Sequence, residues 1–322
     1  MASTTREAAS APRRRRGPKL LRGEALTGWL FVLPWVIGFA AFTLGPMLFS
    51  LYASFTEYNI IRAPVWTGLE NYQDIFRDRF FWISLSNTFW MVAVKTPIMI
   101  IVALGIAVLL NVDLPGTRAF RTIIYLPTVL SGVAAIFLWE WILEPNGLLN
   151  SGLEAFGVRG PAWFSSPIWT KPALVIMGLW WIGTDVIIYL ASLRGIDKTL
   201  YEAAEIDGAS AWAKNWYITI PLLSPTTFFL VITSIIGTFQ IFTTAYILTT
   251  DPTVSTLGGP SHSLLFYVLY LYKYAFGDTQ VPGTSGLAMG YASALAWILF
   301  LIILAITLVQ LWLAKRWVHY GS

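Results

Sequence analysis

The 322-residue sequence contains no cysteine, only two histidines, and few charged side chains, which make up 12% of the chain. Without cysteine there is no disulfide framework, thiol nucleophile or thiolate metal site. His262 and His319 each stand alone in the sequence, without a second ligand at metal-binding spacing. Charged residues form about a quarter of an ordinary soluble domain, so the composition argues against a soluble fold.

The sequence also lacks the motifs of several enzyme classes. It has no G-x-x-x-x-G-K-[ST] motif and no Gly-Lys pair, so it contains no P-loop and is not expected to hydrolyse ATP by itself. No paired acids or histidine cluster lie within the apolar segments, which argues against a membrane-embedded enzyme. An ion-coupled secondary transporter remains the alternative, although no repeated halves with matching broken helices are visible.

Long apolar runs dominate what is present. Hydrophobic residues make up 56% of the chain, tryptophan occurs 16 times, and the mean hydropathy is +0.64. A helix that crosses the hydrocarbon core needs about 20 mostly apolar residues. This length predicts an all-α, polytopic membrane protein with six transmembrane helices, at 29–55, 84–110, 119–143, 172–193, 222–249 and 287–313.

The basic residues predict the orientation of these helices. An even number of spans puts both termini on one side, and that side carries most of the Lys and Arg outside the spans, including the arginines at 13–16. Positive charge marks the cytoplasmic side. We expect cytoplasmic termini, a disordered basic tail over 1–25, and a membrane domain over 26–322. A cleaved signal peptide is disfavoured because the apolar run from Trp29 is too long and lacks an A-x-A-like exit.

One polar segment interrupts the apolar runs: EAAEIDGASAWAKNWYITIP, at 202–221. Thr199 and Glu202 match the capping box that begins a helix. Gly208 is placed to end that helix in a left-handed conformation, and Ser210 to cap a second one. The pattern predicts a helix-turn-helix on the cytoplasmic side. Pro221 is expected to end it, with Ser224 and Pro225 beginning the fifth span.

The composition of this segment favours a protein partner. Its first helix carries Glu202, Glu205 and Asp207, which an anionic membrane leaflet would repel. Small residues that allow close approach of a partner backbone accompany them: Ala203, Ala204, Gly208 and Ala209. The alternative is an amphipathic linker that lies on the lipid headgroups.

The spacing of this segment resembles a known signature. Permease subunits of binding-protein-dependent ABC importers share Glu-Ala-Ala, three residues, Gly, nine residues and Ile-x-Leu-Pro. Here the motif is Glu202-Ala203-Ala204, Gly208 and Ile218-Thr219-Ile220-Pro221, with Ile220 in place of Leu. Further stretches, from about residue 25 to the C-terminus, resemble the carbohydrate branch (maltose, glycerol-3-phosphate and multiple-sugar permeases, larger-subunit kind): 66–72, 125–127, 139–141, 147–150, 258–260, 272–276 and 290–294.

The resemblance implies that the chain is one of several subunits, each with its own role in transport. Such a chain is a transport subunit of a bacterial or archaeal plasma membrane, not an enzyme, and works with a second permease subunit, two ATP-binding subunits and an extracytoplasmic solute-binding protein. ATP and Mg²⁺ are bound by the ATPase partner, so no cofactor is expected in this chain and no nucleic acid as partner. The residues expected to contact the ATPase are Glu202, Ala203, Ala204, Asp207 and Gly208.

Ionisable residues inside a span are functional candidates because they are costly to insert. Asp185 lies in the fourth span, one helical turn after Trp181, and this pair suits a sugar's hydroxyls and its apolar face. Distance from the signature, by resemblance to maltose-type permeases, adds Thr238 and Gln240. The side chains that the maltose permease has there are missing, so maltose itself is not implied. Alternatively, Asp185 forms a structural ion pair with Lys95.

Overall fold

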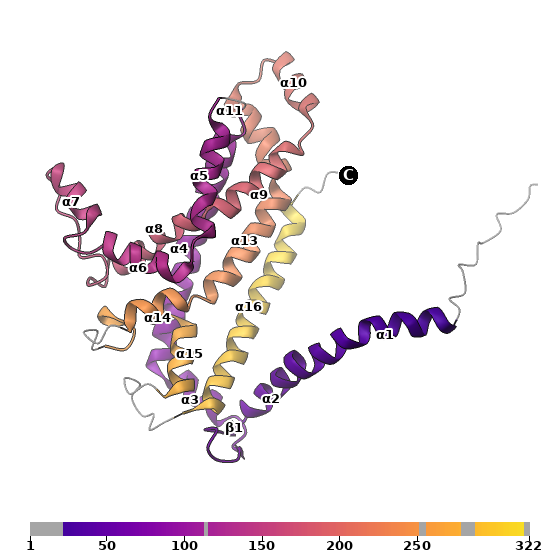
Figure 1. Ribbon diagram of the computed structural model, residues 1–322, viewed down its shortest axis with the longest axis vertical. Coiled ribbons are helices and arrows are strands. Elements are labelled where there is room, and N and C mark those ends of the chain that lie inside the picture. Colours follow the sequence, from indigo (N-terminus) through magenta and orange to yellow (C-terminus); the bar gives the residue numbers. More distant parts are fainter. Residues whose placement is uncertain (1–21, 113–114, 251–255, 278–286, 319–322) are drawn as a thin grey trace, which may run out of the picture. The chain divides into compact units, whose positions relative to one another are not determined.

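The computed structural model describes residues 22–112, 115–250, 256–277 and 287–318. Figure 1 labels its elements, which are almost all helical. The chain divides into two compact units, Met1–Ser50 and Leu51–Ser322, and each is described by itself. In the first, α1 (Arg22–Phe39) continues through a π-helical turn (Ala40–Leu44) into α2 (Gly45–Ala53), which ends in the second unit.

Among the described residues, four helical segments are long and apolar enough to cross a membrane: Thr27–Ala53, Arg79–Leu110, Ser224–Thr249 and Met289–Trp317. Two bent helix pairs raise the number to six if each pair is one span. The predicted all-α membrane fold is therefore confirmed, with two of the six spans broken.

The third predicted span, 119–143, is wrong as a single straight helix. The chain forms α5 (Thr117–Val129) and α6 (Gly132–Ile142), which meet at 102°. Pro127 lies in the last turn of α5, and Leu130 after it has an extended backbone. Pro127 and the following Gly132 weaken the helix at this point. The average hydropathy of a segment does not reveal such a change of helix direction.

The fourth predicted span is bent by 51°. It consists of α8 (Thr170–Gly178), a 3₁₀ turn (Leu179–Trp181) and α9 (Gly183–Arg194). A Cβ on Gly183 would lie 2.4 Å from the Ile124 carbonyl oxygen of α5. Glycine at this position therefore lets the α5 and α9 backbones cross closely.

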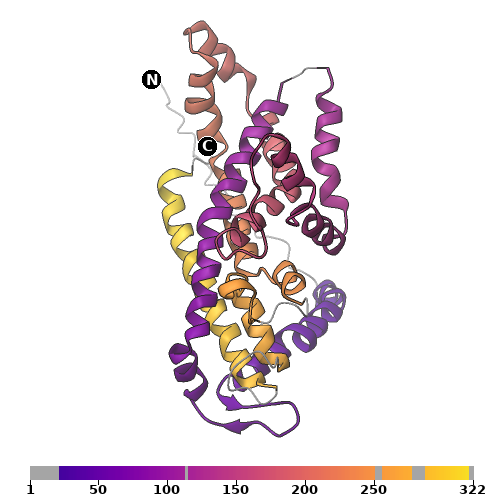
Figure 2. The ribbon, with the colours of Figure 1, turned by 90° about the vertical axis from the view of Figure 1, so that its left-hand side faces the viewer.

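The central helix of the larger unit is α4 (Arg79–Leu110), against which α9, α13 (Ser224–Phe239) and α15 (Tyr267–Phe276) pack, as Figures 1 and 2 show. Between α9 and α13, the Tyr189 hydroxyl donates to Thr227 Oγ1 at 3.0 Å. One apolar core, which includes Ala103, Tyr189 and Leu223, fills the space between α4, α9 and α13. Beside this apolar core, polar side chains of the same three helices line a common space.

A carboxylate joins the elements at the opposite end of this unit from α10. Asp78 caps α4 by accepting from the Phe80 amide at 2.7 Å. Its other oxygen accepts from the hydroxyls of Tyr270, Tyr274 at 2.8 Å and Tyr291 at 3.3 Å. Asp78 thereby links the start of α4 to α15 and to α16 (Met289–Trp317).

Several stretches that carry the family resemblance have structural roles at this end. The strands β1 (Thr56–Glu57) and β2 (Val65–Trp66) form an antiparallel pair, followed by α3 (Glu70–Arg77). The Asn71 amide donates to the Ser54 and Thr56 carbonyls, each at 2.9 Å. A Cβ on Gly290 would lie 2.0 Å from the Thr56 oxygen, so only glycine fits there.

Two further short helices, α7 (Leu148–Ala155) and α14 (Thr243–Thr249), pack against α6. Asn150 is buried and fully bonded: its amide donates to the Pro145 and Pro161 carbonyls, and its oxygen accepts from Trp163 Nε1 at 2.9 Å. Asn87 of α4 donates to the carbonyls of His262 and Leu265, which fixes that loop on the central helix.

Candidate functional site

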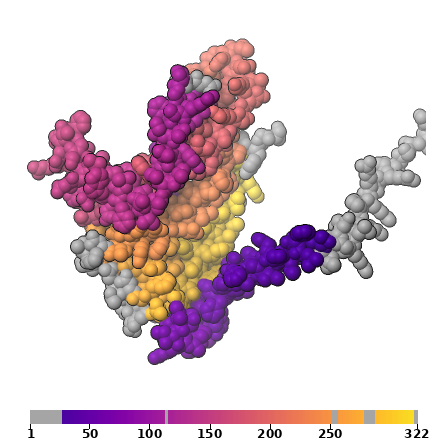
Figure 3. Space-filling model, viewed as in Figure 1, coloured from indigo at the N-terminus to yellow at the C-terminus, as the bar shows by residue number. Residues whose placement is uncertain are grey.

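The polar segment at 197–221, called the elbow below, forms the predicted helix-turn-helix. Its first helix is α10 (Lys198–Ile206), and its second, α11 (Ala211–Lys214), continues into a π-helical turn (Asn215–Thr219). In Figures 1 and 3 the elbow lies at one end of the larger unit. It is therefore accessible to a partner from outside the helical bundle.

The predicted N-cap of the first helix of the elbow is wrong by two residues. Asp197, not Thr199, is the N-cap, and its Oδ1 accepts from the Thr199 amide at 2.9 Å. That hydrogen bond lowers the pKa of the Asp197 carboxyl below its usual value. Because Asp197 is the N-cap and accepts from the Thr199 amide, Thr199 lies inside the first turn and makes no capping box with Glu202.

The predicted turn is confirmed. Gly208 has a φ of +77° and donates its amide to the Glu205 carbonyl at 3.0 Å, while the Ala209 amide donates to the Ala204 carbonyl at 2.8 Å. These two bonds form a Schellman motif, which closes a helix. Ser210 Oγ then accepts from the Ala213 amide at 3.2 Å and caps α11, as expected.

The end predicted for the elbow is confirmed in part. The fifth span begins at Ser224 with Pro225 in its first turn, as expected, but Pro221 itself does not stop the helix, because it lies within the short helix Ile220–Leu222. A proline lacks an amide donor, and its ring clashes with the carbonyl four residues earlier. The π-helical turn just before Pro221 widens the helix at this place. Ser224 is not the N-cap of α13, because it is already the first residue of the helix and Leu223 occupies the cap position; its hydroxyl donates to the Pro221 carbonyl at 2.6 Å.

Two side-chain contacts fix the angle between the helices of the elbow. Lys214 Nζ lies 2.6 Å from Glu205 Oε1, and the hydrogen bond from Lys214 lowers the pKa of the Glu205 carboxyl. The hydroxyl oxygens of Tyr201 and Thr219 lie 2.9 Å apart. The first helix is therefore held against the second in one orientation.

The predicted coupling residues are available on the surface of the elbow. Glu202, Ala203, Asp207 and Gly208 are exposed, and Ala204 is half-buried. Two apolar side chains of α10 are exposed as well, Ile206 at 88% and Leu200 at 45%. An acidic helix with exposed apolar and small residues presents the mixed chemistry of a protein-binding surface.

A cavity of about 420 Å³ lies between α4, the bend at η2 (Leu179–Trp181) with α9, and α13. Its volume falls within the range of small-ligand sites, about 300–1,000 Å³. Three of the four predicted substrate residues line it together: Trp181, Asp185 and Thr238. Gln240 does not line it, since it ends α13 and is exposed.

Other lining residues were not predicted. Lys95 of α4 lies in the wall, as do Thr233 and Ser234 of α13, and Ser234 Oγ donates to Thr96 Oγ1 at 3.3 Å. The spacing of Ser234 and Thr238, four residues apart in an apolar helix, could have indicated this polar face. The sequence suggested Lys95 as a structural partner of Asp185 and did not predict it as part of a ligand site.

Lys95 and Asp185 attract each other electrostatically across this cavity. Within the described part of the chain, the ion pair with an N–O distance of 4.0 Å or less is Lys214–Glu205. Lys95 and Asp185 are thus neighbours of opposite charge without direct contact. Both remain partly accessible.

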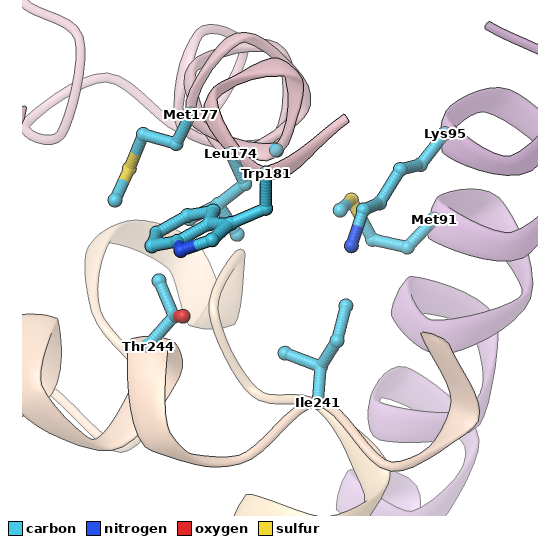
Figure 4. A pocket seen from close by; sticks show the side chains of 8 residues that line it. Met91, Lys95, Leu174, Met177, Trp181, Ile241 and Thr244 are labelled. Carbon is cyan, nitrogen blue, oxygen red and sulfur yellow. The ribbon is translucent and has the colours of Figure 1, made fainter. Parts of the chain in front are cut away.

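A second, smaller cavity of about 170 Å³ adjoins the first and shares Lys95, Gly178 and Trp181 with it. Its other walls are mostly apolar and are formed by Met91, Leu174, Met177, Ile241 and Thr244. Figure 4 shows the Lys95 nitrogen directed into this space, opposite the Trp181 ring. Lys95 therefore stands at the junction of the two cavities.

Apolar helices around a polar-lined cavity, with an exposed elbow at one end, define a membrane transport subunit. The chain belongs to the family of binding-protein-dependent transport system inner membrane components, whose family model matches residues 96–319. Over 94% of its length it is 37% identical to the probable ABC transporter permease protein YesP of Bacillus subtilis, of which it covers 94%.

Two further relatives agree with this assignment. The lactose transport system permease protein LacF of Rhizobium radiobacter is 36% identical over 92% of this chain and 97% of its own. The crystal structure of a bacterial ABC transporter involved in alginate import contains a chain with the same fold, with a TM-score of 0.75, 24% identity, and coverage of 91% of this chain and 96% of that one. The protein is thus a multi-pass membrane permease with an ABC importer fold.

Proposed function

We propose that the chain forms, with a second permease subunit, the pathway of an ATP-driven importer for a sugar or oligosaccharide. The observation that carries this proposal is the elbow, which presents the Glu-Ala-Ala signature on an exposed, capped helix in a chain that matches the binding-protein-dependent family. Relatives named for lactose and arabinooligosaccharide transport support the substrate class. Membership of this family argues against the ion-coupled alternative.

The partners follow from the same family. An extracytoplasmic solute-binding protein delivers the substrate, and two ATPase subunits bind ATP and Mg²⁺. A chain of the same fold occurs in the crystal structure of a bacterial alginate ABC transporter in complex with an alginate pentasaccharide-bound periplasmic protein, which supports the first partner. In this arrangement both termini and the elbow face the cytoplasm, and the permease domain covers 26–322. The predicted basic tail at 1–25 lies outside the described residues, except for Arg22–Ala25, which belong to α1.

The elbow is the proposed contact with the ATPase. Glu202, Ala203, Ala204, Asp207 and Gly208 enter a groove of that subunit, and Ile206 adds apolar area. A ligand-driven change in the ATPase can alter the conformation of the permease only if the elbow makes different contacts with the two conformational states of the ATPase. The Glu205–Lys214 pair keeps α10 fixed to α11, so that displacement of α10 moves the helices behind it.

The larger cavity is the proposed substrate site. Trp181 covers the apolar face of a sugar ring, Asp185 accepts hydrogen bonds from its hydroxyls, and Thr238 contributes a further hydroxyl. These are the few oriented polar groups and the aromatic wall that ligand sites combine. Gln240 contributes to this site only if its side chain turns inward from the end of α13.

The coupling role is tested by charge reversal at Glu202. The permease is purified with its genomic neighbours, reconstituted, and assayed for ATP hydrolysis and sugar uptake. We expect Glu202→Lys to lower ATP-driven uptake about tenfold or more, because an interface charge reversal costs on the order of 1.4 kcal/mol or more. Glu154→Lys, an exposed acid on α7, is the matched control and is expected to transport normally.

Two outcomes would contradict the proposal. One is normal ATP-driven uptake in the Glu202→Lys complex. The other is a wild-type chain that binds no ATPase subunit and transports on an ion gradient alone, which would favour a secondary transporter.

A further inference from the structure

Lys95 is a half-buried cation for which the family assignment gives no role. A lysine near the centre of a membrane helix costs roughly 2.5 to 3.5 kcal/mol on insertion scales, and such residues mark functional sites by default. Lys95 lies in the middle of α4, lines both cavities, and points its nitrogen into the space beside Trp181 (Figure 4). Its place is that of a ligand-binding group.

The surrounding packing fixes where the Lys95 side chain runs. A Cβ added to Gly178 would lie 3.1 Å from Lys95 Cε and 2.7 Å from Met99 Cε. The aliphatic stem of Lys95 therefore crosses the bare backbone of Gly178. This close approach places the amine at the junction of the two cavities, instead of leaving it free to extend along the helix.

The charges of the larger cavity are separated rather than paired. Asp185 attracts Lys95 but does not contact it within 4.0 Å among the described residues. Both line the same 420 Å³ space, in which Thr233, Ser234 and Thr238 supply hydroxyl groups. A ligand between them meets a cation on one side and an acceptor on the other.

The chemistry of these two groups selects a ligand. Asp185 accepts hydrogen bonds from the hydroxyls of any sugar. With a neutral sugar, however, the nearest anion to the Lys95 amine among the described residues remains Asp185, beyond 4.0 Å, beside an apolar wall that includes Met91, Leu174 and Ile241. A hydrogen bond from the charged amine is about twice as strong as a neutral one, and an anionic acceptor adds Coulomb attraction that a sugar hydroxyl does not provide. An anionic group on the saccharide would complete the coordination of the amine.

We propose that Lys95 is a specificity-determining residue that binds an anionic group, such as a uronic acid carboxylate, on the transported saccharide. The inference rests on the proposed function and adds the substrate class to it. The sugar ring that carries the anionic group lies beside Trp181. Its anionic group contacts Lys95, and its hydroxyls contact Asp185 and the hydroxyls of α13. The smaller apolar cavity then receives the adjoining part of the ligand.

The test measures binding to the purified permease–ATPase complex without the solute-binding protein, so that the selectivity of that protein does not enter. The probes are digalacturonate, sucrose 6-phosphate and lactose. We expect digalacturonate to bind about tenfold more tightly than lactose, the size of a 1.4 kcal/mol preference. Comparison of digalacturonate with the phosphate distinguishes a carboxylate from a phosphate as the preferred anion.

Variants separate the charge of Lys95 from its position. Lys95→Met is expected to abolish the preference for the acidic disaccharide and leave lactose binding within about threefold, whereas Lys95→Arg retains the preference. Gly178→Ala keeps the charge but displaces the stem, and is expected to weaken the preference in part. Lys171→Met is the matched control, since Lys171 lies against the Trp90 ring and lines neither cavity.

Equal affinity of the wild-type complex for digalacturonate and lactose would overturn the proposal, as would an unchanged preference in Lys95→Met. The proposal would also be overturned if Lys95→Met and Asp185→Asn both prevented assembly of the complex and Lys95→Arg showed no preference for the acidic disaccharide. Those results would indicate that Lys95 and Asp185 form a structural ion pair. ATP-driven uptake by the wild-type complex is measured in parallel. If that uptake is absent, the proposed function fails; if it is present without acid preference, only the role of Lys95 fails.

Discussion

Gly208 shows how one residue sets the geometry of the elbow. Its backbone has a φ of +77°, and no heavy atom lies within 4 Å of the position of an added Cβ. The requirement for glycine is therefore conformational and not steric. Left-handed conformations cost L-residues other than glycine roughly 1–2 kcal/mol, with asparagine and aspartate the best tolerated.

This distinction predicts different effects of two substitutions at the same position. Gly208→Val is expected to open the turn and reduce ATP-coupled uptake, because a β-branched residue is strained in this conformation. Gly208→Asn is the control and should retain most activity. Hydrogen exchange at Ala209, whose amide closes the turn, reports the opening directly. Equal activity of the two variants would show that the turn conformation does not matter for coupling.

The directions of the helices could not be predicted from the sequence. Hydropathy predicted all six apolar segments, because window composition and length suffice for that purpose. It could not predict the 102° break between α5 and α6 or the 51° bend before α9, since these depend on which backbones pack together. Gly183 provides such a contact, where α9 crosses α5 at Ile124.

The crossing predicts unequal effects of two glycine-to-alanine changes. Gly183→Ala places a methyl group 2.4 Å from a backbone oxygen, and overpacking of this kind costs about 1–3 kcal/mol. Gly105→Ala, in α4 with nothing within 4 Å, should be neutral or slightly stabilising because alanine favours helices. The measurement is the thermal unfolding midpoint of the purified complex. A midpoint for Gly183→Ala equal to that of Gly105→Ala would refute the close crossing.

At the scale of the whole molecule, sequence reasoning predicted the class and the elbow but only part of the cavity. Gly208 and Ser210 were predictable because turns and caps depend on local residue types. Asp185 and Trp181 were predicted from an ionisable residue within a span and an aromatic one turn before it, and Thr238 from its distance to the signature; the cavity brings the three together. The position of Lys95 could not be predicted, since it depends on α4 packing against Gly178.

The orientation of the chain can be measured because the sequence contains no cysteine. Each introduced cysteine is then the single thiol of the protein. In intact cells we expect a membrane-impermeant maleimide to label Ser261→Cys, in the loop before α15, and not Ala211→Cys, on the elbow; both positions are exposed. Both should react after the membrane is opened. The reverse pattern would invert the orientation predicted from the basic residues.

The π-helical turn before Pro221 has a mechanical consequence. Because it accommodates the proline, Ala211 at the elbow and Thr238 in the cavity wall lie on consecutive helical segments that are joined only through Leu223, whose backbone is also helical. No long loop lies between these two positions to absorb a movement. We therefore expect a displacement of the elbow to be transmitted along the backbone to the cavity wall.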